Sequence, residues 1–277
     1  MSSFDLISDI HLDFWVTPGW NAFKKKSLEE FIQKILPPQP SAVLIIAGDI
    51  GHDNKQNYKL LKALKEHYTY ILLVAGNHDY YMLTPSIRYK FGFNSMNRLD
   101  DMKKRIKYLP NVLFLDGDVV TIDGTHYGGC GMWYDFQYAI QILNSNYPEI
   151  YEHWKSVSND AKLTRGKPRD TKEMFYEEKR KLARILPYSD VIITHFSPDW
   201  SRSPQVGKLS KATSYYYFDG APFFPLISKK IWCFGHMHRR MDYVNHDCRF
   251  VNASLGYPQE NDGQSERAVQ IRIPPKS

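Results

Sequence analysis

Short, largely apolar runs recur through the first third of the chain. Residues 4–8, 42–47 and 70–75 form three such runs, and each is followed by a glycine or a polar residue. Runs of this length are typical of strands that are buried on both faces. Between them, residues 27–36 and 55–68 carry apolar side chains at helical spacing. The alternation of strand and helix predicts an α/β fold with a largely parallel sheet and right-handed crossovers.

The first predicted helix has recognisable ends. Ser27 followed by Glu30 has the spacing of a capping box, and Pro37-Pro38 comes directly after the last apolar position. We therefore expect this helix to span residues 27–36.

The remaining two thirds of the chain are less regular. Residues 134–187 are polar and helical without strand signals, which indicates an insertion or a cap. We expect a single domain over residues 1–277 with a mainly helical insertion at about 134–188. The other expected elements are a helix at 90–107, a strand at 112–115, a hairpin of 119–122 with 126–130, strands at 191–194 and 231–234, and a terminal hairpin of 250–253 with 268–273.

Five short polar motifs follow these apolar runs. Three lie beyond the predicted N-terminal strands, and two follow strands in the second half of the chain. Because ligands of open α/β sheets bind beyond the carboxyl ends of strands, we expect the motifs to converge in space. The motifs are Asp9-Ile10-His11, Gly48-Asp49, Gly76-Asn77-His78-Asp79, His195 and Gly235-His236-Met237-His238.

The side chains in these motifs are of the kinds that bind divalent metal ions. Their mixed nitrogen and oxygen donors suit manganese, iron or zinc better than calcium, and magnesium is also possible. We expect two divalent ions, with manganese as the first choice. Two ions about 3.5–4 Å apart need a shared anionic ligand, and Asp49 is best placed to be that bridge. The predicted metal ligands are Asp9, His11, Asp49, Asn77, His195, His236 and His238.

His78 is the histidine of these motifs that the ligand set does not need. It adjoins Asn77 and can protonate a leaving oxygen or support the transition state electrostatically, so we expect both residues to contact the substrate. Asp79 could orient His78 or cap the segment that follows. A water bridging two metal ions becomes hydroxide near neutral pH and attacks phosphorus in line. The motifs therefore predict metal-assisted hydrolysis of a phosphate ester.

In order and spacing, the five motifs resemble the sequence blocks of the calcineurin-like metallophosphoesterases. The blocks D-x-H, G-D, G-N-H-[DE], H and G-H-x-H all occur, over residues 4–254. The resemblance implies a four-layer αββα sandwich of two mixed sheets, a dinuclear metal site, and His78 as the catalytic histidine. Residues 128–135 are also similar to a glycine–tryptophan segment of many bacterial and phage members. The family pattern assigns one ion to Asp9, His11, Asp49 and His238, and the other to Asp49, Asn77, His195 and His236.

Differences from other branches of this family reduce the number of substrate classes that we expect. Protein serine/threonine phosphatases have the motifs G-D-x-V-D-R-G and R-G-N-H-E, whereas residues 48–53 and 75–79 lack those phosphate-binding arginines. Pyrophosphohydrolases of lipid A synthesis usually carry arginine at the position of His78. DNA-repair nucleases of the family normally add a DNA-binding cap and a longer tail.

We therefore expect a phosphodiesterase or phosphatase acting on a nucleotide-type phosphodiester or phosphomonoester. One alternative is a DNA or RNA nuclease, which the net charge of +6 permits. Another is a non-catalytic scaffold similar to the retromer-type subunits of the same fold. The presence of His78 and of every predicted ligand argues against the scaffold.

Composition adds few further constraints. The chain has 277 residues, of which 43% are hydrophobic and 24% charged, as in ordinary globular proteins. No apolar run approaches the roughly 20 residues that span a bilayer. The first apolar stretch lacks the basic flank of a secretory signal, and the three cysteines form no C-x-x-C pair. We expect a cytoplasmic protein with no membrane partner.

Other residues leave alternatives open. Aromatic residues at 80–81 and 215–218 could stack on a nucleobase or pack in the core. Five histidines outside the matching motif positions are expected to be surface or structural residues; they are His52, His67, His126, His153 and His246. Five basic residues near the histidine motifs could bind phosphate or remain solvated; they are Arg202, Lys208, Lys211, Arg239 and Arg240.

Overall fold

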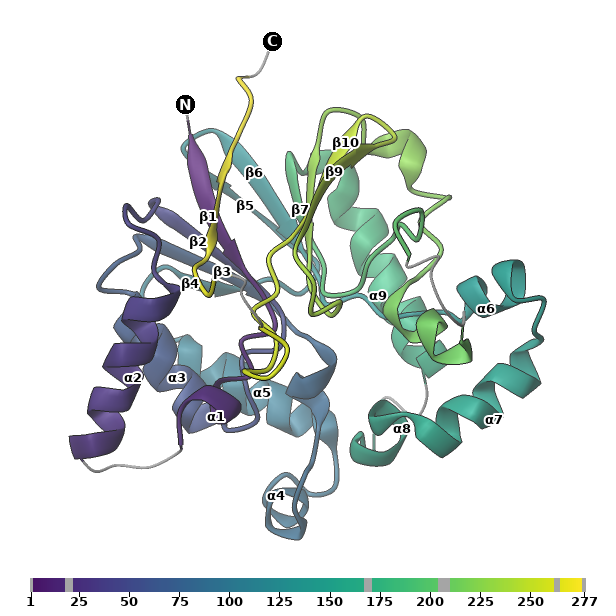
Figure 1. The fold of residues 1–277 in the computed structure, drawn as a ribbon, viewed down its shortest axis with the longest axis horizontal. Helices are drawn as coiled ribbons and strands as arrows, with labels where there is room; N and C mark the ends of the chain where they lie inside the picture. The colour runs from purple at the N-terminus through teal and green to yellow at the C-terminus, as the bar shows by residue number, and fades with distance from the viewer. Residues whose placement is uncertain (1, 18–21, 167–170, 204–209, 262–264, 276–277) are drawn as a thin grey trace.

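Two β-sheets lie face to face, and helices cover the outer face of each (Figure 1). This computed structural model describes residues 2–17, 22–166, 171–203, 210–261 and 265–275. The arrangement confirms the predicted four-layer αββα sandwich with two mixed sheets. None of the helices in these ranges is long and apolar enough to cross a bilayer.

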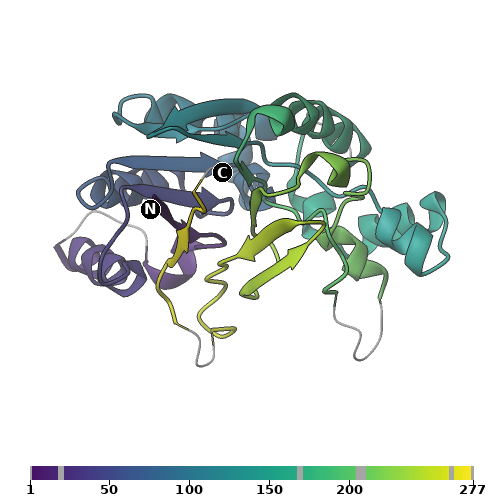
Figure 2. The same ribbon diagram turned by 90° about the horizontal axis from the view of Figure 1, so that it is seen from above.

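The first sheet contains the N-terminal strands. Its order is β11-β1-β2-β3-β4, with parallel pairing from β1 to β4 and antiparallel pairing of β11 with β1. Figure 2 shows the yellow C-terminal strand beside the purple N-terminal one. The strands are β1 (Ser3–Ile7), β2 (Val43–Ala47), β3 (Tyr70–Val74), β4 (Val112–Phe114) and β11 (Val269–Arg272).

The second sheet is formed by later parts of the chain. Its order is β5-β6-β7-β8-β10-β9, with parallel pairing from β6 through β7 and β8 to β10. The two outer pairs, β5 with β6 and β9 with β10, are antiparallel. The strands are β5 (Asp118–Ile122), β6 (Thr125–Gly129), β7 (Val191–Ile193), β8 (Ile231–Phe234), β9 (Met241–Asn245) and β10 (Cys248–Asn252).

Helices of both halves form the outer layers. Figure 1 shows α2, α3 and α5 beside the first sheet, and α9 beside the second. The α-helices are α1 (Leu12–Trp15), α2 (Ala22–Ile35), α3 (Asn54–Leu64), α4 (Pro85–Lys90), α5 (Ser95–Ile106), α6 (Gln137–Ile142), α7 (Tyr147–Val157), α8 (Asn159–Leu163) and α9 (Thr171–Ile185). The 3₁₀ segments are η1 (Asn77–Tyr80), η2 (Leu186–Tyr188), η3 (Lys211–Tyr216) and η4 (Phe224–Leu226).

Three apolar cores hold the four layers together. Successive side chains of a strand point to opposite faces, so Leu72 packs between the sheets while Ile71 and Leu73 pack against the helices of the first layer. In the second sheet, Cys233 faces the first sheet and Trp232 faces the other outer layer. Each central strand is therefore buried on both faces, which explains its continuous apolar sequence.

The predicted terminal hairpin is wrong. Residues 250–253 overlap β10, which pairs with β8 and β9 in the second sheet, whereas β11 pairs with β1 in the first. β10 forms its hairpin with β9, whose residues are all exposed or half-buried and carry no continuous apolar run. Both segments were correctly expected to be strands, but strand pairing across about 270 residues leaves no local pattern in the sequence.

Two helix predictions also need correction. The helix expected at 27–36 is already helical from Ala22, so Ser27 lies inside it and does not cap its N-terminus. The helix expected at 90–107 corresponds to α5, which begins only at Ser95, and the separate helix α4 ends at Lys90. The chain between them passes through left-handed backbone at Gly92 and Phe93, and the Asn94 side chain then caps α5.

Replacing Leu72 by alanine should destabilise the protein because the side chain is fully buried between the sheets. We expect the free energy of unfolding in urea to fall by about 2–5 kcal/mol. The matched control is Leu226→Ala in η4, where the leucine is 50% exposed and the change should stay within about 0.5 kcal/mol. Equal losses for the two variants would contradict the assignment of this core.

Candidate metal centre

The ends of parallel strands position most of the predicted ligands. Asp9 and Asp49 each follow the last residue of β1 or β2 by two positions, and His195 and His236 do the same after β7 and β8. Asn77 begins η1, shortly after β3. Strands of both sheets therefore deliver their polar residues to one rim of the sandwich, as the sequence analysis expects.

The backbone of this rim is unusual. Five of the seven predicted ligands have positive φ angles, a conformation that non-glycine residues seldom adopt. Such residues concentrate at functional sites, where the surrounding structure holds them in place. They are Asp9 (φ 50°), His11 (44°), Asp49 (56°), His236 (65°) and His238 (45°).

Two motif glycines make room for the ligands. A Cβ atom at Gly48 would lie 2.3 Å from Nδ1 of His195, and one at Gly76 would lie 2.1 Å from Oδ1 of Asp49. Only glycine permits the loops to approach each other this closely.

One group of ligands comes from the loop after β1 and from the loop after β8. Asp9, His11 and His238 form a cluster whose ligand atoms lie close enough to share a cation. The Nε2 atoms of His11 and His238 are 3.0 Å apart, and Nε2 of His238 is 3.6 Å from Oδ1 of Asp9.

A second group lies beside the first and is equally compact. Asp49, His195 and His236 form a further cluster suited to a cation. Nε2 of His195 is 3.3 Å from Oδ2 of Asp49 and 3.0 Å from Oδ1 of Asn77. The two groups contain six of the predicted ligands, and Asn77 lies beside the second group. A further cluster of His11, Asp49 and His78 links the two groups.

Asp49 lies between the two groups. Its Oδ1 accepts a hydrogen bond from the backbone of His78, whereas its Oδ2 is buried and has no hydrogen-bond partner. That Oδ2 is 3.9 Å from Nε2 of His11 in one group and 3.3 Å from Nε2 of His195 in the other. A buried, unpartnered carboxylate oxygen is costly, and a pair of cations would satisfy it. The residues present therefore fit two divalent ions.

Outer hydrogen bonds aim the imidazoles at this point. Nδ1 of His195 is 2.8 Å from the carbonyl oxygen of Ala47, and Nδ1 of His238 is 2.5 Å from Oε2 of Glu260. Both contacts leave Nε2 to face the site, which is the usual support for a metal-binding histidine. Asp9 is fixed in a similar way, because Oγ of Ser254 donates to it at 2.7 Å.

Burial and charge set the protonation of these groups. Although burial opposes it, the carboxylates of Asp49 and Asp9 raise the pKa of His195 to about 9. Burial, with His195 alongside, lowers the pKa of His236 to about 3. The pKa of the Asp49 carboxyl lies well below its ordinary value because His195 and His78 outweigh the effect of burial.

His78 lies at the edge of the two groups and contacts a histidine that the motifs did not single out. Nδ1 of His78 is 2.8 Å from Nε2 of His52, and Nδ1 of His52 is 2.6 Å from Oδ2 of Asp13. Asp13 also accepts the backbone N–H of His52 at 2.7 Å. Although burial opposes the effect, these hydrogen bonds lower the pKa of Asp13 to about 2. Burial holds the pKa of His78 well below its ordinary value, so its ring is neutral at pH 7.

Buried Arg98 fixes the two loops that carry these histidines. Its guanidinium donates to the carbonyl oxygens of His78, Gly51 and His52 at 2.6–3.0 Å. His52 therefore lies beside His78 in the site and is not a surface residue. The sequence feature that could have identified His52 is its position three residues after Asp49. Nothing in the sequence indicated a role for Arg98.

Asp79 caps its own segment. Its Oδ2 accepts the backbone N–H of Gly76 at 2.8 Å, at the start of η1, so it caps the segment that contains it and not the segment that follows. Three of the remaining histidines have contacts elsewhere: His126 with Asp190, His153 with the hydroxyl of Tyr215, and His246 with the ring of Phe224. His67 is exposed.

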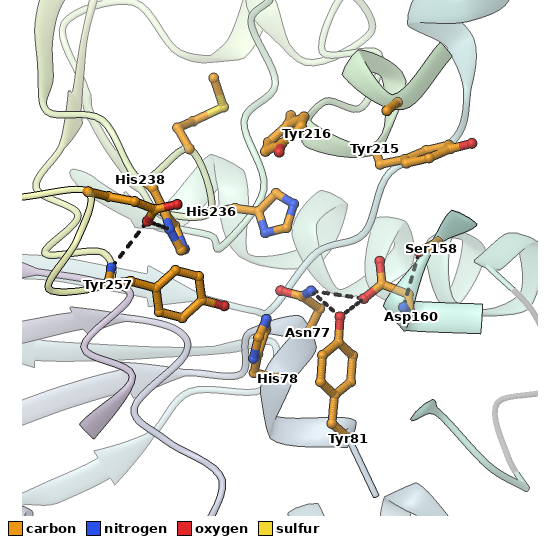
Figure 3. Close-up of a pocket in the computed structure, with 13 residues that line it drawn as sticks. Asn77, His78, Tyr81, Ser158, Asp160, Tyr215, Tyr216, His236, His238 and Tyr257 are labelled. Atoms are coloured by element: carbon orange, nitrogen blue, oxygen red, sulfur yellow. Dashed lines mark hydrogen bonds and ion pairs between the residues drawn. The ribbon is translucent and has the colours of Figure 1, made fainter. Parts of the chain in front are cut away.

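A cavity of about 480 Å³ opens over the site (Figure 3). Tyr81, Tyr215, Tyr216 and Tyr257 line it, so part of the predicted aromatic surface does face the site. Tyr80, Tyr217 and Phe218 are buried and do not line it. The complete described lining is Asn77, His78, Tyr81, Ser158, Asp160, Ala212, Tyr215, Tyr216, His236, Met237, His238, Tyr257 and Glu260.

No lysine or arginine contributes to that described lining. Lys211 pairs with Glu149, and Nη2 of Arg240 donates to the carbonyl oxygen of Arg267. The guanidinium of Arg202 lies over the ring of Tyr243. Arg239 is exposed, and Lys208 lies outside the described residues.

Comparisons with known proteins show the family of this chain and its fold. A sequence model of the calcineurin-like phosphoesterases matches residues 2–240. The uncharacterized protein L509 of Acanthamoeba polyphaga mimivirus is 24% identical over 267 residues, covering 92% of this chain and 91% of its own. The phosphopantetheinyl hydrolase of Mycobacterium tuberculosis has a similar fold, with a TM-score of 0.67 and 19% identity over 97% of this chain and 95% of that one. A dimetal phosphatase from Danio rerio aligns with a TM-score of 0.42 and 12% identity, over 91% and 86% of the two chains.

Metal-stripped protein should bind two Mn²⁺ ions per chain, because two ligand groups share the unpartnered oxygen of Asp49. In Asp49→Asn the bridge loses its charge, and we expect at least one ion to be lost. Equilibrium dialysis followed by elemental analysis measures the ratio. Asp100→Asn, at an exposed position of α5, is the matched control and should keep both ions. Unchanged binding by Asp49→Asn would contradict the assignment.

Proposed function

Because the chain belongs to the calcineurin-like phosphoesterase family, we propose that it is a metal-dependent hydrolase of phosphate esters. The observation that carries the proposal is the buried Oδ2 of Asp49, which lies without a hydrogen-bond partner between two imidazole-rich groups. Such an oxygen is suited to bridging two cations.

The proposed ligand sets follow the two groups. Asp9, His11, Asp49 and His238 would hold one ion, and Asp49, Asn77, His195 and His236 the other. We propose Mn²⁺ as the native ion. Two such ions, when bound, lower the pKa of a water molecule and neutralise charge on the phosphoryl oxygens.

His78 is proposed as the catalytic histidine. It lines the cavity beside Asn77, and its ring is neutral at pH 7 because of burial. Nδ1 of His52 lies 2.6 Å from Oδ2 of ionised Asp13, and Nε2 of His52 lies 2.8 Å from Nδ1 of His78. In this arrangement the proton that Nε2 of His78 gives to the leaving oxygen of the ester is replaced at Nδ1 by one from Nε2 of His52, so that the ring of His78 stays neutral.

The cavity supports a small ester with a flat organic group. The four lining tyrosines offer aromatic faces on which a base can stack. A nucleic-acid backbone requires several cationic contacts, and the described lining contains no lysine or arginine. We therefore propose a nucleotide-type phosphodiester or phosphomonoester as substrate, in preference to DNA or RNA.

Hydrolysis of bis-p-nitrophenyl phosphate and p-nitrophenyl phosphate by the Mn²⁺-loaded protein tests the proposed activity. We expect turnover of at least one of them, reduced about 10²–10⁴-fold in His78→Ala because the proton donor is lost. Turnover of the diester indicates a phosphodiesterase, and turnover of the monoester alone indicates a phosphatase. If two ions are bound and neither these esters nor a panel of nucleotides is hydrolysed, the scaffold alternative gains and the proposed activity fails.

His52→Ala should lower kcat about 10–100-fold while leaving KM and the bound metal unchanged, because His52 orients His78 without contacting the predicted ligands. The pH dependence of kcat should change as well, since the Asp13–His52–His78 chain is broken. Exposed His67→Ala is the matched control and should leave both kcat and its pH profile unaltered. Wild-type kcat in His52→Ala would show that this chain has no part in the reaction.

A further inference from the structure

The side-chain amide of Asn77 must be oriented correctly to serve as a ligand. Only its oxygen can face a cation, and an amide turned by 180° would present its NH₂ group instead. In the structure, Oδ1 lies 3.0 Å from Nε2 of His195, on the side of the metal centre. Nδ2 points away and donates to Oδ1 of Asp160 at 2.8 Å and to the hydroxyl of Tyr81 at 3.0 Å (Figure 3).

Asp160 comes from the segment predicted as an insertion. It lies in α8, 83 positions after Asn77, and α8 contacts η1. Its side chain lines the cavity beside the metal centre. The helical segment therefore reaches into the site and supplies the hydrogen-bond acceptor nearest to the amide nitrogen of Asn77.

The surroundings of Asp160 hold its carboxylate in one position. Asp160 is only 5% exposed, and the hydroxyls of Tyr81 and Tyr134 donate to its two oxygens at 2.5 and 2.6 Å. Tyr134 is itself fixed, because Nε1 of Trp154 donates to its hydroxyl at 2.5 Å. None of the hydrogen bonds described for this carboxylate comes from a lysine or arginine. Burying an acid in this way is costly.

We propose that Asp160 is a positioning residue that keeps Oδ1 of Asn77 turned towards the ion shared by Asp49, Asn77, His195 and His236. Asp160 lies in residues 134–188, the segment predicted as a helical insertion. Through Asp160, this segment would control whether that one ion is bound. This inference rests on the proposed function, because it requires that the two metal ions are bound. It makes no use of catalysis, so binding alone can test it.

Asp160→Asn is the informative substitution because it preserves shape and changes hydrogen bonding. An asparagine there has one acceptor oxygen for three donors, so the Asn77 amide loses its partner or turns over. We expect the dissociation constant of one Mn²⁺ ion to rise about 10–100-fold while that of the other is unchanged. Titration calorimetry of metal-stripped protein measures both constants.

Tyr134→Phe is the matched control. It removes a hydrogen bond from the same carboxylate but leaves the contact with Asn77 in place, so both ions should bind as in the wild type. If Asp160 only anchors the insertion, the two variants will show similar metal binding, and the proposal is overturned. Wild-type binding in Asp160→Asn also overturns it.

The exchanged pair Asn77→Asp with Asp160→Asn provides a second test, including for the case that Asp160→Asn does not fold. The pair keeps a hydrogen bond between the two positions and presents a carboxylate oxygen to the ion, so we expect two ions to bind. Failure of the folded pair to bind two ions overturns the proposal. A wild-type protein that binds fewer than two ions overturns it together with the metal assignment. Two bound ions without ester hydrolysis would overturn the proposed function alone.

Discussion

Parallel strand pairing is the constraint on which the rest of the structure depends. In the first sheet β1, β2 and β3 run in one direction, and in the second sheet β7 and β8 do the same. Each of these strands ends at one rim and is followed there by a predicted ligand or by the loop that contains one. The sheets also meet at this rim, where Ser8 bridges to Ser254 beyond β10. Packing of the apolar layers therefore determines where the polar chemistry lies.

The sequence contains the information for those strands in local form. Continuous apolar runs identified β1, β2, β3, β7 and β8, and the motifs beyond them identified the residues that the structure gathers into two groups. Strand pairs that are distant in sequence were not accessible in this way, because the partner of β11 is decided by register across the whole chain. Half-buried β9 lacked the apolar pattern that marks a central strand.

The supporting residues of the site were harder to predict than the ligands. His52 and Asp160 act on neighbours through hydrogen bonds between loops, and neither residue has a spacing that implies its partner. Arg98 was even harder to predict, since an arginine on a helix is normally solvated. The burial of Arg98 depends on three carbonyl oxygens from two other segments. A hydrogen-bond network is a property of the assembled fold. The spacing of apolar residues along the chain indicates which side chains are buried, but it does not indicate their hydrogen-bond partners.

The left-handed backbone at five of the predicted ligands affects which substitutions the protein can accept during evolution. Each of these non-glycine residues costs roughly 1–2 kcal/mol relative to ordinary backbone, and glycine would pay none of it. Substitution of Asp9 or His238 by glycine would relieve that strain while deleting a ligand. At Asp9 the same change would also leave the N–H of His236 and the hydroxyl of Ser254 without their acceptor. The backbone strain and the hydrogen bonds of a ligand therefore act in opposite directions on the stability of this rim.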